Sequence, residues 1–152
     1  MTLDTAQQEQ TIHIERSIDI KAPPATVFES VLAELGPESQ MPGGQPFPMV
    51  LEAWPGGRWF RDLGNKAGHL WGHVQVIKPP TLLEISGPMF VSFPAINHVQ
   101  YRLTAQDDGT NLKLVHRALG LVPAGYFDGV EEGWEYGLER IREIAERSRR
   151  QR

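Results

Sequence analysis

Residues 126–147, YFDGVEEGWEYGLERIREIAER, decide the fold. No proline follows Pro123, so nothing interrupts a helix over this stretch. An apolar stripe runs along it at spacings of 4, 4, 3 and 4, as one buried face of a helix requires: Val130, Trp134, Leu138, Ile141 and Ala145. The pattern predicts a long amphipathic helix that needs a surface to cover its apolar face.

Three glycines run beside this stripe, at positions 129, 133 and 137. In a helix interior each glycine costs about 1 kcal/mol relative to alanine. The energetic cost of a helix ridge without side chains therefore needs a structural reason. We expect either that a strand approaches the ridge closely or that a cavity lies over it.

The rest of the chain supplies the surface. Four isoleucines alternate with polar residues over 11–20, which predicts a strand, and a short amphipathic helix follows Pro23-Pro24 and ends at Gly36-Pro37. Turn residues then separate six further expected strands: 49–54, 58–63, 68–78, 81–87, 97–105 and 110–119. The order predicts an α+β fold, with one antiparallel sheet of about seven strands and the helices on one face.

Two loops stand out by composition. Residues 36–48 hold four prolines and three glycines, which excludes a regular element and is typical either of a lid or binding segment or of a flexible connector. Residues 88–94 are apolar for a loop. We expect Phe90 and Phe93 either to cap a pocket or to fold back onto the core.

Composition narrows the function classes. The 152 residues carry 15 basic and 19 acidic side chains and no cysteine. The net charge of -4 argues against nucleic acid as a partner, and the absence of cysteine excludes disulfides and thiolate metal sites. No stretch approaches the ~20 apolar residues of a membrane span. We expect a cytoplasmic protein with a flexible lead (1–10), a single domain (11–147) and a basic tail (148–152).

Motifs for catalysis and cofactors are weak. No serine sits in a Gly-x-Ser-x-Gly turn, and no glycine loop suits a nucleotide, so no cofactor is expected. His69 and His73 would lie ~13 Å apart on a strand, too far for one metal ion. If Leu70 faces the core, Trp71 lies on the outer face between these histidines, where it marks a dimer contact or is a singly exposed side chain.

Several titratable side chains are expected to point toward the hollow. Alternation with Leu112 and Leu114 turns His116 inward, where it either orients a ligand, acts as a base or is a buried histidine bonded to a neighbour. Tyr101 faces the same way. Arg61, if Trp59 and Leu63 on its strand face inward, needs an anionic partner such as Glu52 or a ligand carboxylate.

Four segments together resemble one known family. They are Ala53–Trp59, Gly72–Leu83, Thr110–His116 and Glu132-Gly133-Trp134 with the following Leu138 and Ile141. The chain resembles, over roughly 11–147, the family named for the activator of the heat-shock-protein-90 ATPase, within the START-like (SRPBCC) superfamily. The resemblance implies a helix-grip fold, in which a curved sheet grips the C-terminal helix around a pocket for an apolar ligand. The loop over 38–48 stands where such proteins often have a second short helix.

Three function classes follow. The first is binding of a small hydrophobic or amphipathic ligand, the second an enzyme of cyclase or dehydratase type that uses His116 and Tyr101, and the third a module that binds a chaperone or another protein. A homodimer is possible in each case. The residues predicted to contact a ligand are Trp59, Arg61, Ile85, Val99, Tyr101, Leu114, His116, Phe127 and Trp134.

Overall fold

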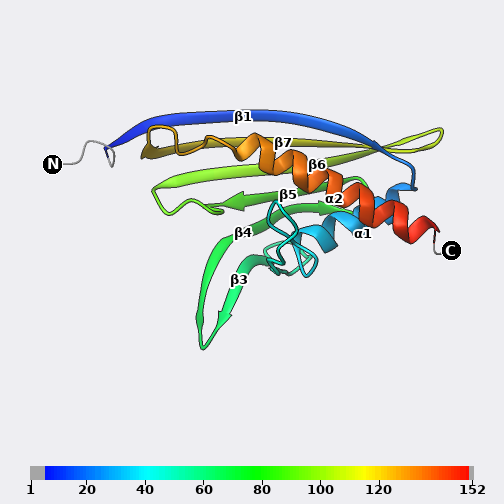
Figure 1. Cartoon of the computed structure of the whole chain (residues 1–152), viewed down its shortest axis with the longest axis horizontal. Helices are drawn as coiled ribbons and strands as arrows, with labels where there is room; N and C mark the ends of the chain where they lie inside the picture. The colour runs from blue at the N-terminus through cyan, green and yellow to red at the C-terminus, as the bar shows by residue number, and fades with distance from the viewer. Residues whose placement is uncertain (1–5, 151–152) are drawn as a thin grey trace.

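A computed structural model of the chain describes residues 6–150 and has the predicted α+β architecture (Figure 1). The elements follow one another as β1 (Gln7–Ile20), α1 (Pro24–Leu35), β2 (Val50–Leu51), β3 (Arg58–Gly64), β4 (Ala67–Lys78), β5 (Leu82–Gly87), β6 (Ala95–Gln106), β7 (Gly109–Pro123) and α2 (Val130–Arg150). Strands β2 to β7 form a meander of antiparallel neighbours. The helix-grip arrangement is therefore confirmed.

The sheet is completed by the first strand. Its order is β1-β7-β6-β5-β4-β3-β2, and β1 pairs with β7 from Gln7↔Pro123 to Ile20↔Thr110. Helix α2 runs along one face of the sheet, with α1 beside its C-terminal half (Figure 1). The predicted apolar stripe of α2 therefore has the curved sheet as its covering surface.

Element boundaries differ from the expected ones at both ends. Residues 7–10, expected in the flexible lead, belong to β1, and the Gln10 side chain donates to the carbonyl oxygens of Val122 and Pro123 at 3.2 and 2.8 Å. Helix α2 begins at Val130 instead of 126, because Gly129 has a φ of +85°, which is incompatible with a right-handed α-helix. It extends to Arg150, into the expected tail, and residues 1–5 and 151–152 lie outside the described part.

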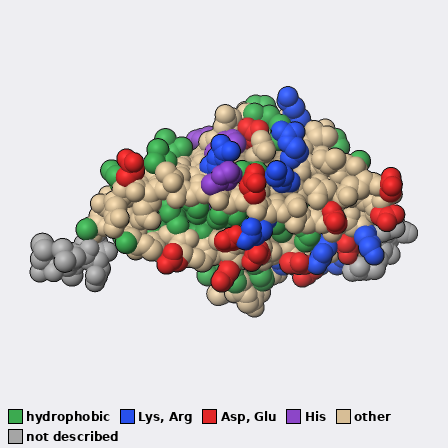
Figure 2. Space-filling view, turned by 90° about the horizontal axis from the view of Figure 1, so that it is seen from above, with side chains coloured by type: hydrophobic (Ala, Val, Ile, Leu, Met, Phe, Trp, Pro, Cys, Tyr) green, Lys and Arg blue, Asp and Glu red, His purple; other side chains and the backbone are tan. Residues whose placement is uncertain are grey.

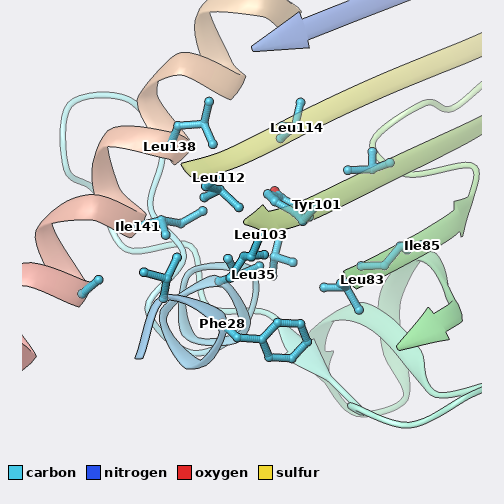
Figure 3. Close-up of a cluster of buried hydrophobic side chains, with 14 of the residues drawn as sticks. Phe28, Leu35, Leu83, Ile85, Tyr101, Leu103, Leu112, Leu114, Leu138 and Ile141 are labelled. Carbon is cyan, nitrogen blue, oxygen red and sulfur yellow. The ribbon is translucent and has the colours of Figure 1, made fainter. Parts of the chain in front are cut away.

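The core joins both helices to the middle of the sheet. Figure 3 shows Leu138 and Ile141 of α2 facing strands β6 and β7, with Leu35 of α1 beside them. Tyr101 is 1% exposed and lies within this cluster. The C-terminal half of α2 thus packs against the core, whereas its first half lies against other segments.

A bulge in β4 reverses the predicted facing of one tryptophan. Trp59 pairs with Gly72 and Phe60 with Leu70, so Trp71 is an extra residue on β4. The bulge changes the alternation, and Trp71 packs against the core while Leu70 is 43% exposed. The sequence placed Trp71 on the outer face only if Leu70 faced the core, and the structure has the opposite arrangement. The argument for a dimer contact at Trp71 thereby loses its basis.

Charged side chains of both signs are interspersed on the face shown in Figure 2, without a large basic area. Within residues 6–150, neither helix has the length and apolar character that crossing a bilayer requires.

Candidate functional site

A cavity of about 590 Å³ lies over the first half of α2. Its walls come from α2, the end of α1, the loops over 36–48 and 88–94, and strands β3 and β4. Gly129, Gly133 and Gly137 all line it, and a Cβ added at Gly133 would meet no atom within 4 Å. Of the two explanations for the glycine ridge, the structure therefore has the cavity.

Six aromatic rings contribute to the wall, and Trp71 contacts three of them. Its ring makes edge contacts with Trp59 at 5.0 Å and Phe90 at 5.9 Å, and a tilted contact with Phe47 at 6.0 Å. The indole nitrogen of Trp59 donates to the carbonyl oxygen of Leu35 at 2.7 Å. Because these contacts fix the rings relative to one another, the wall is preformed.

The loop over 36–48 covers one side of the cavity and is held to α2. The Tyr136 hydroxyl donates to Oε1 of Gln40 at 3.1 Å, and the Arg140 guanidinium donates to the carbonyl oxygen of Glu38 at 3.3 Å. On the other side, the guanidinium of Arg61 stacks on Phe47 at 3.9 Å from the ring centroid. The segment is therefore held in place by these contacts and lines the cavity.

Arg61 has a different role from the expected one. Besides its stacking on Phe47, it donates to the carbonyl oxygen of Pro48 at 3.2 Å, and it does not line the cavity. Glu52 pairs instead with Arg58 at 2.7 Å, which holds the pKa of the Glu52 carboxyl at about 2. The ring of Phe47 and a backbone carbonyl therefore satisfy the Arg61 cation, and no ligand carboxylate is needed.

A chain of hydrogen bonds supports the wall from behind. The indole nitrogen of Trp134 donates to Nδ1 of His116 at 2.9 Å, and Nε2 of His116 lies 2.8 Å from Oδ1 of Asn97. Since Nδ1 accepts, the proton is on Nε2 and is donated to Asn97. Asn97 in turn donates to the carbonyl oxygen of Pro88 at 3.1 Å, which ties the 88–94 loop to the same chain.

His116 is therefore a buried, neutral histidine. It is 0% exposed, and burial, with a smaller contribution from His98, lowers its pKa to about 4. Both ring nitrogens have protein partners, and His116 does not line the cavity. Of the three interpretations offered by the sequence, the structure supports the histidine bonded to its neighbours, which here positions Trp134.

One buried carboxyl on the cavity wall was not predicted. Glu34, near the end of α1, is 8% exposed and lines the cavity opposite Gly137. Burial raises its pKa from 4.5 to about 7, against the opposing effect of nearby Arg140. The sequence did carry a sign of it, because Glu34 follows Val27 by seven residues and Val31 by three, on the buried face of α1.

The predicted site residues divide into two groups. Trp59 and Trp134 line the cavity. The others lie behind its wall or beside it: Ile85, Val99, Tyr101 and Leu114 are in the core, His116 lies behind Trp134, Arg61 lies beneath Phe47, and the ring of Phe127 packs on Tyr126 at 5.8 Å.

The cavity lining that sequence reasoning did not assign comes mainly from loops and from the bulge. Of the two phenylalanines expected either to cap a pocket or to fold back onto the core, Phe90 lines the cavity, whereas Phe93 packs on Tyr126 at 5.2 Å. The remaining unassigned lining residues are Leu35, Ser39, Gln40, Met41, Pro42, Phe47, Trp71, Tyr126, Asp128 and Val130.

A second hollow, of about 690 Å³, lies at the β6–β7 turn and is lined mostly by polar and charged side chains. Asp19 in its wall already accepts hydrogen bonds from Gln106 and Asn111, at 2.9 and 3.0 Å. The aromatic cavity is the better candidate, because ligand sites are mostly apolar with few polar groups. Within residues 6–150, no cluster of side chains suited to a metal ion occurs.

Comparison with protein families gives one match. Residues 21–146 match the family described as Activator of Hsp90 ATPase homolog 1-like protein. A search of curated proteins gave no match.

Solved structures share the fold at low sequence identity. An uncharacterized protein from Rhizobium leguminosarum is 20% identical with a TM-score of 0.69, over 94% of this chain and 99% of that one. A protein of unknown function from Staphylococcus aureus is 13% identical with a TM-score of 0.69, over 94% and 98%. The di-domain ARO/CYC StfQ from the steffimycin biosynthetic pathway is 11% identical with a TM-score of 0.63, over 91% of this chain and 51% of StfQ.

Proposed function

The chain belongs to the family described as Activator of Hsp90 ATPase homolog 1-like protein, and from this premise we propose that it binds a small apolar or amphipathic ligand in the cavity over the first half of α2. The observation that carries the proposal is the bare glycine ridge. Gly133 lies inside a helix, where glycine is costly, and faces open space that any larger residue would fill.

The dimensions and chemistry of the cavity support a small molecule. Ligand sites typically measure about 300–1,000 Å³ and are lined by hydrophobic and aromatic side chains with few polar groups. Here the volume is about 590 Å³, and six aromatic rings line it: Phe47, Trp59, Trp71, Phe90, Tyr126 and Trp134.

Catalysis by His116 and Tyr101 has little support. Neither side chain lines the cavity, and both are at most 1% exposed. His116 has no free nitrogen, and burial, with a smaller contribution from Glu34, raises the pKa of Tyr101 well above its ordinary value. A cyclase or dehydratase built on these two groups would need the wall to open first.

The test is a calorimetric titration of the full chain with 2-naphthylmethanol, a neutral aromatic probe. We expect saturable binding to the full chain and its loss in Gly133→Leu, whose side chain would occupy the cavity. Glu132→Leu adds a leucine to the exposed side of the same helix and serves as the control. Equal binding by Gly133→Leu and the unmodified chain would contradict the proposal.

A further inference from the structure

One polar group in this cavity is left without a partner. Among the described residues 6–150 no hydrogen bond and no ion pair within 4 Å joins the Glu34 carboxylate to a neighbour, although its residue is only 8% exposed and Arg140 attracts it from farther away. Buried carboxylates are costly unless they are paired. The attraction of Arg140 offsets only part of the cost of burial, so the fold itself gains little from a glutamate at this position.

The geometry leaves this carboxylate open to a guest. A Cβ added at Gly137 would lie 3.6 Å from both Glu34 carboxylate oxygens, in ordinary contact with them. With glycine at this position, no side chain of α2 stands between the carboxylate and the cavity at that point. Glu34 thus lines a space otherwise formed largely by aromatic rings.

The charges around Glu34 favour a cation. Glu34 and Asp128 are acidic, and none of the described lining residues is Lys or Arg. Arg140 on α2 attracts the Glu34 carboxylate but forms no ion pair with it. Its two terminal nitrogens pair with Glu38 and Glu143, and within residues 6–150 its buried Nε has no hydrogen-bond partner. Tyr101, which also interacts with Glu34, stays neutral. A ligand carboxylate or phosphate would find no counter-charge on this wall.

We propose that the cavity selects a ligand with an apolar, preferably aromatic, body and a protonated amine, whose nitrogen is held by the Glu34 carboxylate among the aromatic rings. This inference rests on the proposed function and names the class of its ligand. An ammonium group supplies the charge-assisted hydrogen bond that Glu34 lacks. The faces of Trp and Tyr rings attract the same cation.

The experiment compares three probes with one aromatic body: 2-naphthylmethylamine, 2-naphthylmethanol and 2-naphthoate. Calorimetric titration of the full chain at pH 8 is expected to rank them in affinity as amine, then alcohol, then carboxylate. Glu34→Gln should weaken amine binding about tenfold or more, since hydrogen bonds to charged groups are worth about 1.5–3 kcal/mol. It should leave the alcohol within about threefold. Glu29→Gln removes the same charge from the exposed side of α1 and should change neither affinity.

A second measurement needs no variant. The amine requires an ionised Glu34, and the pKa of Glu34 is raised to about 7 in the free protein. Amine affinity should therefore fall about tenfold for each pH unit below 7, whereas alcohol affinity should stay constant. Tyr101, which also interacts with Glu34, stays neutral across this range because burial raises its pKa well above its ordinary value.

The outcomes separate this inference from the proposed function. If all three probes bind equally well and Gly133→Leu blocks them, the cavity binds ligands but the amine preference is refuted. The same holds if the carboxylate binds best, or if Glu34→Gln binds the amine as the unmodified chain does. If no probe binds, the proposed function fails together with the inference.

Discussion

Replacing Glu34 by glutamine should stabilise the protein in a pH-dependent way. The folded protein holds Glu34 with a pKa of about 7, whereas a glutamate in the unfolded chain has a pKa near 4.5. Between these values the folded state binds more protons, so the contribution of Glu34 to the free energy of unfolding falls as pH rises. The glutamine side chain of the variant does not titrate and has no such dependence.

The magnitude follows from the two pKa values. Each pKa unit corresponds to 1.36 kcal/mol, so Glu34→Gln should gain up to about 3 kcal/mol between pH 4 and pH 8 relative to the unmodified chain. For a chain of this size, that corresponds to a rise in melting temperature of roughly 6–12 °C.

The assay is urea unfolding of both proteins at pH 4, 5.5, 7 and 8.5. The difference between them should grow from about pH 4.5 to about pH 7 and then level off. Glu29→Gln, on the exposed side of the same helix, should show no comparable trend. A constant difference across this range, or one that shrinks as pH rises, would refute the burial of an unpaired carboxyl at position 34.

Three further variants test the wall and the ridge. Because the pKa of His116 is lowered to about 4, the free energy of unfolding of the unmodified chain should fall by up to about 3 kcal/mol as pH falls from about 6.5 to about 4. His116→Gln should remove this contribution to the pH dependence, which urea unfolding at these two pH values measures. Trp134→Phe should cost about 1–3 kcal/mol in urea unfolding by leaving Nδ1 of His116 unpaired, while Trp54→Phe, at a 58% exposed position, should change stability by less than about 0.5 kcal/mol. Gly133→Ala should stabilise by up to about 1 kcal/mol, whereas Gly57→Ala should destabilise because its Cβ would overlap neighbouring backbone. A lower melting temperature for Gly133→Ala than for the unmodified chain would contradict the open space over the ridge.

Periodicity predicted the architecture because the strands and the stripe of α2 each have one buried face. The glycine ridge, a costly sequence feature that needs a structural explanation, predicted either the close approach of a strand or a cavity, and the structure has the cavity. The prediction placed the start of α2 too early because Gly129 takes a positive φ. A hydrophobic pattern alone does not report backbone conformation.

The wall of the cavity was harder to predict. Alternation fails at a bulge, so Trp71 was assigned to the opposite face from the one it occupies. Inward-facing strand residues such as Leu114 and Val99 were expected at the ligand, but they lie in the core. The position of the cavity along α2 depends on how far the core fills the space between helix and sheet, and this is a property of packing.

Glu34 was missed because glutamates near helix ends are usually solvated. Its position on the buried face of α1 was visible in the sequence, but only the structure shows that Arg140, the cation that attracts it, forms its ion pairs with Glu38 and Glu143 instead.

The central claim is that a guest occupies the space over Gly133. The most direct measurement is a set of intermolecular NOEs between 2-naphthylmethanol and the isotope-labelled full chain. Contacts from the naphthyl protons to Phe90, Val130 and Trp134 are expected, because these side chains line the cavity. NOEs confined to exposed side chains such as Ile96 and Leu119 on the outer face of the sheet would contradict the account.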